Sequence, residues 1–322
     1  MADPGVEAVA GAQADVAALL PIVDLAPFMR DAAGRAAVVA DVAKALEFSG
    51  FLYVRGLPVT DAQVADAFAT AQRFFAKPAD EKRRYGYTDI DANFGYQAVE
   101  VESLDPTRPP DLKETFTMRN AAALARDDAR WPDPAFRDTA LAFWDAVFAS
   151  AQRMLEILAT ALDVPPGFFA PLHRGENVSL RFLHYPANLP RRGPEQLGAG
   201  AHTDYGSITL LFQDDVGGLE VRDAQGVWIP APPVPGCTVI NTGDLMERWT
   251  NGRFRSTLHR VRPIEGARAR QSIALFVDPD SAVEVECFPS CTGAGRPPRY
   301  PVITAGEHIR QKIAATHEAT RK

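Results

Sequence analysis

Three residues of this sequence have side chains and a spacing that suit the chelation of one metal ion. His202 and Asp204 are separated by a single residue and lie between a loop rich in Pro and Gly and an apolar run. Side chains at positions i and i+2 of an extended strand point to the same face, so an imidazole nitrogen and a carboxylate oxygen are presented together. His259 lies in the β-prone segment Arg-Ser-Thr-Leu-His-Arg-Val, far enough along the chain to belong to another strand of the same sheet. We therefore predict that these three residues bind one metal ion.

A second group of residues is suited to bind a carboxylate. Two histidines and one carboxylate leave other coordination positions open, which is the arrangement of non-heme Fe(II) oxygenase sites, with zinc as the main alternative metal. Arg270 and Ser272 open the next strand-like run and share one face. A guanidinium fork beside a hydroxyl recognises a carboxylate with paired hydrogen bonds, which favours iron with an oxo-acid cosubstrate. A surface ion pair, near Arg262 and Arg268, is the alternative interpretation of Arg270.

The order His-x-Asp, His, Arg-x-Ser resembles the isopenicillin N synthase-like branch of the Fe(II)/2-oxoglutarate-dependent dioxygenases. His-Tyr-Pro at 184–186, Asn-Thr-Gly-Asp at 241–244 and Trp-Thr-Asn-Gly at 249–252 add to the resemblance, which runs from about residue 20 to about residue 317. It implies Fe(II), 2-oxoglutarate as cosubstrate and O₂. In this interpretation Arg270, Ser272 and Tyr185 bind the 2-oxoglutarate carboxylate.

Candidates for contact with the substrate are harder to separate from core residues. On the strand around Tyr185, alternation places Arg181 on the same face and His184 on the other, so we interpret His184 as structural. Aromatic residues near the metal motif either line the substrate pocket or pack in the core. The candidates are Arg181, Tyr205, Phe276, Phe94 and Phe116. Residues 85–105 are rich in aromatic and acidic residues and are either a lid or a packed surface loop.

The elements that position these residues change in type along the chain. Apolar periodicity predicts helices over 32–49, from a Thr60 capping box to about 76, and over 136–162. From Asn177 onward, short strands alternate with Gly, Pro and Asp turns, one of them at 241–244, and no helix is expected before about residue 305. The predicted fold is mainly β with flanking helices: a double-stranded β-helix (jelly-roll) core preceded by an N-terminal α/β region.

The domain prediction is a single folding unit. It has a loose tail over 1–18, an N-terminal region with helices and lid loop over 19–135, and a long helix plus jelly-roll core over 136–322, with the catalytic part at about 177–285 and a C-terminal helix. The net charge of −7 and pI near 5.5 give no electrostatic reason to bind nucleic acid or an anionic membrane. Three cysteines without paired spacing, and no signal-like start, predict a cytoplasmic protein. The sequence does not predict the oligomeric state.

The resemblance predicts an enzyme that hydroxylates or desaturates a small-molecule metabolite, with release of succinate and CO₂. One alternative is an oxidase or cyclase of the same fold that uses Fe(II) and O₂ without 2-oxoglutarate. A more distant one is a zinc hydrolase or a metal-binding jelly-roll sensor. Neither of the latter explains the Arg270 and Ser272 pair together with Tyr185.

Overall fold

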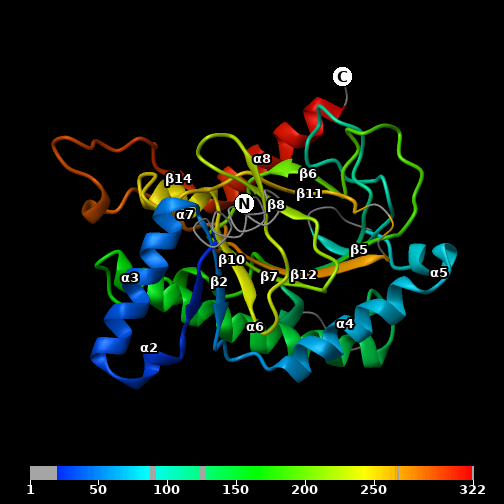
Figure 1. Ribbon diagram of the computed structural model, residues 1–322, viewed down its shortest axis with the longest axis horizontal. Helices are drawn as coiled ribbons and strands as arrows, with labels where there is room; N and C mark the ends of the chain where they lie inside the picture. The colour runs from blue at the N-terminus through cyan, green and yellow to red at the C-terminus, as the bar shows by residue number, and fades with distance from the viewer. Residues whose placement is uncertain (1–19, 88–91, 124–127, 265, 267, 321–322) are drawn as a thin grey trace, which may run out of the picture.

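The computed structural model describes residues 20–320, apart from residues 88–91, 124–127, 265 and 267. The expected tail over residues 1–18 lies outside the described residues. Two β-sheets face each other at the centre of the molecule, and helices cover the outer face of the larger one (Figure 1). This arrangement confirms the predicted jelly roll with flanking helices.

The larger sheet has eight strands in the order β1-β2-β10-β7-β12-β5-β4-β3. Strands from the first part of the chain therefore sit at both edges of the sheet that forms the predicted catalytic core. This continuity supports one folding unit, although the domain boundaries stay a prediction. The strands are β1 (Ile22–Asp24), β2 (Phe51–Arg55), β3 (Phe94–Gln97), β4 (Glu114–Arg119), β5 (Val178–Tyr185), β7 (Ile208–Gln213), β10 (Thr238–Thr242) and β12 (Arg270–Val277).

The smaller sheet has the order β6-β11-β8-β9 and faces the inner side of the larger sheet. An inner apolar cluster fills part of the space between them and includes Leu183 and Ala274 from the large sheet with Val221 and Val261 from the small one. The strands are β6 (Ala199–His202), β8 (Leu219–Arg222), β9 (Trp228–Pro230) and β11 (His259–Val261), and a separate hairpin pairs β13 (Glu284–Val285) with β14 (Ile303–Thr304).

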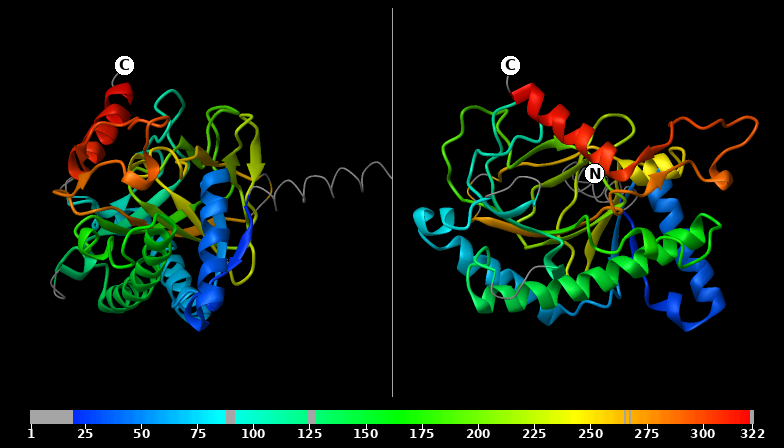
Figure 2. Two further views of the ribbon diagram at one scale, coloured as in Figure 1. Left: turned by 90° about the vertical axis from the view of Figure 1, so that its left-hand side faces the viewer. Right: turned by 180° about the vertical axis from the view of Figure 1, so that it is seen from behind.

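An outer apolar cluster joins the helices to the opposite face of the large sheet. Helices α4 and α6 run along this face, while the small sheet and helix α8 lie on the other side of the molecule, as the two further views confirm (Figure 2). The Thr60 capping box is confirmed, with the Thr60 hydroxyl accepting the Gln63 N–H. The helices are α2 (Ala26–Arg30), α3 (Ala32–Phe48), α4 (Asp61–Phe75), α5 (Ala79–Arg83), α6 (Pro134–Ala161), α7 (Asp244–Trp249) and α8 (Ala305–Thr320).

Helix α7 corrects the expectation that no helix occurs between residues 177 and 305. It has six residues, too few for an apolar period to be visible, and its start lies in the motif that we interpret from sequence as a turn. The start of the helix is hydrogen-bonded to the segment around His202 and Asp204, since the Asp244 N–H donates to the Asp204 carbonyl at 2.8 Å. Gly243 is required there, because a Cβ atom would lie 2.5 Å from the Gly206 carbonyl oxygen. No helix among the described residues is long and apolar enough to cross a membrane.

A buried ion pair ties helix α5 to the large sheet. Lys82 Nζ lies 2.7 Å from Glu114 Oε2, and both side chains are less than a tenth exposed. We expect Lys82→Met to lower the free energy of unfolding by about 3 kcal/mol, because the buried carboxylate loses its cation. Chemical denaturation measures this loss. The matched control is Lys77→Met, which breaks a partly exposed pair with Glu81 and should cost less than about 1 kcal/mol. Equal losses in the two variants would contradict the prediction.

Candidate metal and cosubstrate site

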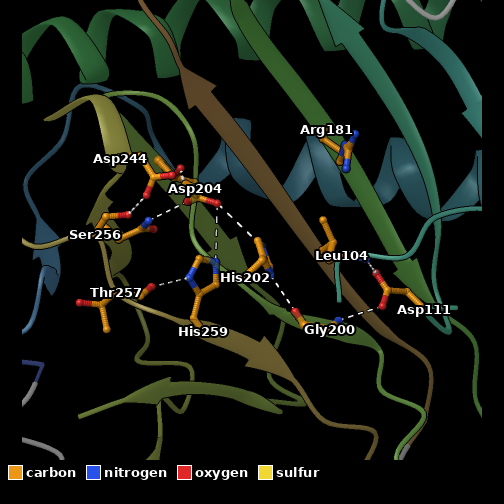
Figure 3. A network of polar contacts seen from close by, with 12 residues as sticks. Leu104, Asp111, Arg181, Gly200, His202, Asp204, Asp244, Ser256, Thr257 and His259 are labelled. Atoms are coloured by element: carbon orange, nitrogen blue, oxygen red, sulfur yellow. Dashed lines mark hydrogen bonds and ion pairs between the residues drawn. The ribbon is translucent and has the colours of Figure 1, made fainter. Parts of the chain in front are cut away.

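His202, Asp204 and His259 come together between the two sheets. His202 ends β6 and His259 begins β11, and the two residues are directly paired across these antiparallel strands. Asp204 Oδ1 lies 3.8 Å from His202 Nε2 and 3.7 Å from His259 Nε2 (Figure 3). One ligand atom from each residue lies within 4.8 Å of the other two. The three predicted ligands therefore form a single cluster that one metal ion could bridge.

Backbone carbonyls fix the orientation of both imidazole rings. His202 Nδ1 lies 2.8 Å from the Gly200 carbonyl oxygen, and His259 Nδ1 lies 3.1 Å from that of Thr257. A carbonyl oxygen only accepts, so each Nδ1 carries the proton and each Nε2 presents a lone pair. Burial, together with the neighbouring His259, lowers the pKa of His202, which favours the neutral ring. Both rings thus direct Nε2, and not Nδ1, toward the Asp204 carboxylate.

The carboxylate of Asp204 is oriented by two side chains from neighbouring strands. Its Oδ2 atom accepts a hydrogen bond from Thr209 Oγ1 at 2.5 Å and from Asn241 Nδ2 at 2.7 Å. These bonds occupy one oxygen and leave Oδ1 directed at the two histidines (Figure 3). Burial acts to raise the pKa of this carboxyl group, but the two histidines and the two donors hold it below its usual value. The group is therefore an anionic carboxylate with one oxygen available to a metal ion.

Arg270 is a buried cation, and no ion pair involves it among the residues that the structure describes. It begins β12, is 5% exposed, and bonds only neutral groups: Nη1 donates to Ser272 Oγ at 3.1 Å, Nε to the Gly217 carbonyl at 2.6 Å and Nη2 to Gln213 Oε1 at 3.1 Å. The predicted pairing of Arg270 and Ser272 on one face is confirmed. A buried guanidinium without a counterion is costly, and a ligand carboxylate would supply that counterion.

Tyr185 lies beside this guanidinium. The two residues are paired across β5 and β12, and Arg270 Cζ lies 4.7 Å from the Tyr185 ring centroid. Both residues line a pocket of about 220 Å³ that also involves Arg262 and Arg268. None of the three metal-cluster residues lines that pocket, so we do not interpret it as the substrate site.

The prediction that Phe94 and Phe116 line the substrate pocket is wrong. Both are buried in the outer cluster, where Phe116 stacks edge to face on Phe74 of α4 and Phe136 of α6. Strand β4 presents Thr115 and Thr117 to the inner face instead. The aromatic side chains therefore join the sheet to the helices and do not approach the metal cluster.

The other candidates lie on the inner side. Arg181 and Phe276 project from β5 and β12, with the Arg181 Cζ atom 5.9 Å from the Phe276 ring centroid. Tyr205 follows the metal ligand Asp204 and is half-buried beneath α8, where Lys312 Nζ lies 5.6 Å from its ring centroid. His184 points to the outer face and bonds Glu114 through Nδ1 at 2.7 Å, which confirms its structural interpretation.

The segment between β3 and β4 packs over the site. Leu104 packs against the inner cluster, and Asp111 Oδ1 accepts the Gly200 N–H at 2.9 Å, two residues before His202. Gly200 permits this approach, because a Cβ atom would lie 2.7 Å from the Asp105 backbone nitrogen. Part of the segment considered as a lid, residues 88–91, lies outside the described residues. The interpretation of residues 85–105 as a lid therefore stays a prediction.

Sequence reasoning missed four residues that shape this site. Thr209 and Asn241 orient the metal carboxylate, and Glu102 and Lys113 pair with each other at 3.0 Å on the inner face. A signal for Asn241 was present, because a lone amide in the apolar strand Thr238–Thr242 is unusual. The glycine and aspartate that follow it favoured a turn instead. The two charged residues gave no comparable signal.

Comparison with known proteins agrees with this geometry. Residues 176–279 match the 2OG-Fe(II) oxygenase superfamily, and residues 20–134 match the N-terminal region described as non-haem dioxygenase in morphine synthesis. The chain is 36% identical over 309 residues to the 2-oxoglutarate-Fe(II) type oxidoreductase hxnY of Emericella nidulans, covering 90% of this chain and 88% of that protein. A 2-oxoglutarate-Fe(II) type oxidoreductase of Aspergillus fumigatus is 32% identical over 94% of both chains.

Solved structures show the same likeness. A full-length Neurospora crassa protein, crystallised with alpha-KG (2-oxoglutarate) and thymine, superposes with a TM-score of 0.82. The identity is 31%, and the match covers 92% of this chain and 97% of that one.

Proposed function

The chain belongs to the 2OG-Fe(II) oxygenase superfamily, and we propose that it holds its catalytic iron with His202, Asp204 and His259. The protein is an Fe(II)- and 2-oxoglutarate-dependent dioxygenase that oxidises its substrate with O₂. The observation that carries the site assignment is the convergence of two Nε2 atoms and one carboxylate oxygen. Two imidazole nitrogens and one anionic oxygen suit Fe(II). An ion held by these three residues would keep other coordination positions open for further ligands.

We assign the far carboxylate of 2-oxoglutarate to Arg270, Ser272 and Tyr185. The buried Arg270 guanidinium has only neutral partners, and Ser272 Oγ lies 3.1 Å from its Nη1 atom. A carboxylate bound here gains charge-assisted hydrogen bonds and relieves the uncompensated buried charge. Tyr185 adds a phenol beside the same guanidinium.

Bound iron supplies the O₂ chemistry that couples conversion of 2-oxoglutarate to succinate and CO₂ with oxidation of the substrate. The chain's own residues fix positions and limit water. Thr209 and Asn241 keep the carboxylate of Asp204 in one orientation, and Leu104 covers the site from the β3–β4 segment. Such positioning matters, because displacement of a reacting group by about 1 Å can cost on the order of 100-fold in rate.

The proposed substrate is a small metabolite that is hydroxylated or desaturated. The thymine complex of the Neurospora crassa protein shows that a fold this similar accommodates a small planar ring. We propose that Arg181 and Phe276, on the inner face of the large sheet, contact the substrate. Tyr205, which follows Asp204 in the chain, is a third proposed contact. We also propose a cytoplasmic location, since Fe(II) is maintained in a reducing compartment, and cell fractionation tests this. Neither nucleic acid nor a membrane surface is proposed as a partner.

An anaerobic titration tests the assignment. Purified protein is titrated with Fe(II) and then with 2-oxoglutarate, and the weak visible charge-transfer band of the iron-chelated oxo acid is followed. We expect the band to form at one equivalent of iron, and succinate to be released when O₂ is admitted. Iron binding without the band and without succinate would instead support an oxidase that uses no 2-oxoglutarate.

Asn241 provides a test of the side chains that orient Asp204. We expect Asn241→Ala to weaken Fe(II) binding by about 10-fold to 100-fold, because the ligand carboxylate loses a fixed donor. The measurement is competition for Fe(II) with a chromogenic chelator. Asn251→Ala is the control, since Asn251 is also buried but bonds the Cys291 carbonyl, outside the metal cluster. Unchanged iron affinity in Asn241→Ala would contradict the role assigned to this amide.

A further inference from the structure

Four charged side chains form a continuous row on the inner side of the site, which we call the polar wall. Arg181 Nη1 lies 3.1 Å from Glu102 Oε1, Glu102 Oε2 lies 3.0 Å from Lys113 Nζ, and Lys113 forms a short ion pair with Asp111. The row thus alternates cation, anion, cation, anion. It joins β5 to the segment between β3 and β4.

The polar wall has no net charge. Burial acts to raise the pKa of Glu102, but Arg181 and Lys113 hold it well below its usual value. Burial also raises the pKa of Asp111, yet its oxygens face only donors: Lys113, the Gly200 N–H and the Leu104 N–H. That donor set favours the ionised carboxylate. Two cations and two carboxylates therefore balance, and no unpaired cation remains for an anionic substrate.

The polar wall has a sealed end, at Lys113 and Asp111, and a more accessible end, at Arg181 and Glu102. The side chains of Lys113 and Asp111 are sealed, at 1% and 2% exposed, whereas Arg181 and Glu102 retain 15% and 24%. The Asp111 end connects to the metal site through Gly200, whose carbonyl orients the His202 ring. The accessible end reaches the metal cluster through Phe276: Arg181 lies beside its ring, and Phe276 is paired with Thr209, whose hydroxyl bonds Asp204. A molecule at the metal cluster would thus meet Arg181 and Glu102.

These two residues retain complementary hydrogen-bonding capacity. A guanidinium has five N–H donors, and Arg181 uses them on Thr117, on the two oxygens of Glu102 and on Tyr87, which accounts for four at most. Within the described part of the chain, Glu102 Oε1 accepts a hydrogen bond from Arg181 only, while Oε2 contacts both Arg181 and Lys113. Among the residues that the structure describes, at least one N–H of Arg181 and one lone pair of Glu102 therefore have no partner. The Phe276 ring beside Arg181 adds a flat apolar surface.

We propose that the polar wall selects an uncharged substrate that carries a hydrogen-bond acceptor next to a donor, as in an amide, lactam or imide, and disfavours substrates with a carboxylate. The acceptor binds Arg181 and the donor binds Glu102. A substrate carboxylate would find both nearby cations already neutralised and would face the Glu102 carboxylate, and such like-charge contact is unfavourable away from water. This inference rests on the proposed function, because it places the substrate beside the iron ligands.

The test compares two pairs of probes that differ by a carboxylate. The pairs are 2-pyrrolidinone with pyroglutamate, and thymine with 5-carboxyuracil. Dissociation constants are measured anaerobically from the change that each probe causes in the visible band of the Fe(II) and 2-oxoglutarate complex. We expect the neutral member of at least one pair to bind at least about 10-fold more tightly than its carboxylated counterpart. Tighter binding of the carboxylated members, or no binding of either neutral probe, overturns the proposal.

A charge change in the polar wall sharpens the test. In Glu102→Gln the wall has one excess cation, so we expect the ratio of the two dissociation constants to shift by about 10-fold or more toward the carboxylated probe. Glu100→Gln is the matched control, because Glu100 lies in the same segment but pairs with Arg192 at the surface. The control should keep the wild-type ratio. Equal ratios in all three proteins overturn the proposal.

Two further measurements keep the outcome decisive. If thermal unfolding shows that Glu102→Gln does not fold, Arg181→Gln replaces it. This variant leaves one excess anion, and it should weaken the neutral probes and exclude the carboxylated ones. The band of the Fe(II) and 2-oxoglutarate complex is recorded before any probe is added. Its absence in the wild-type protein would refute the proposed site assignment, whereas a normal band with no charge preference would refute only the inference about the substrate.

Discussion

Asp204→Ala is expected to abolish both Fe(II) binding and turnover. Asp204 supplies the only anionic atom of the metal cluster, and its Oδ1 lies within 3.8 Å of both histidine Nε2 atoms. Without it, two neutral imidazoles from adjacent strands remain, and they offer the ion no charge neutralisation. Turnover should fall by at least about 1,000-fold, since the O₂ chemistry belongs to the metal. Iron content after anaerobic loading and succinate release measure the two effects.

Asp223→Ala controls for the loss of any carboxylate near the small sheet. Asp223 lies in the turn between β8 and β9, where it accepts the N–H groups of Gln225 and Val227. This variant should bind iron normally. Full activity in Asp204→Ala would refute the ligand assignment, and the loss of iron from both variants would indicate a general effect on folding.

The metal cluster could be predicted because its geometry follows from local rules. The spacing of His202 and Asp204 fixes a common face, and the antiparallel pairing of β6 and β11 brings His259 opposite His202. The same rule predicted that Arg270 and Ser272 lie together. In both cases two residues separated by one position carry most of the information, and the order of the motifs along the chain supplies the rest.

The residues that orient Asp204 depend instead on the order of strands in the sheet. Thr209 and Asn241 belong to β7 and β10, which are neighbours although 24 residues separate the end of one from the start of the other. Periodicity gives the face of each side chain but not the neighbouring strand. The Glu102 and Lys113 pair poses the same difficulty, because Glu102 lies in an irregular segment.

The errors over Phe94 and Phe116 have a related physical cause. Strands β3 and β4 are buried on both faces, so an aromatic residue on either face looks alike in the sequence. The inner face of β4 is in fact the polar one, with Thr115 and Thr117, because it borders the polar wall. The outer face is aromatic because it packs on α4 and α6. On β4, the large apolar side chains therefore belong to the core between the sheet and the helices, and the polar side chains face the site.

Arg270→Ala is expected to raise the KM for 2-oxoglutarate by roughly 30-fold or more, and to prevent formation of the charge-transfer band at moderate cosubstrate concentration. The loss corresponds to about 2 kcal/mol, the value of charge-assisted hydrogen bonds to one carboxylate. Iron binding should persist, since Arg270 contacts none of the three proposed ligands. Arg270→Lys should recover part of the affinity, because it keeps the charge but loses the guanidinium fork that pairs with a carboxylate.

Arg268→Ala is the matched control, since this arginine lies two residues earlier, is exposed, and pairs with Asp215 at the surface. Its KM for 2-oxoglutarate should stay within about threefold of wild type, because a screened surface pair contributes less than about 1 kcal/mol. The contrast separates a specific carboxylate contact from a general effect of positive charge at this end of the barrel. An equal rise of KM in both variants would place the cosubstrate carboxylate outside the Arg270 and Ser272 pair, and an unchanged KM in Arg270→Ala would show that Arg270 does not bind the cosubstrate carboxylate.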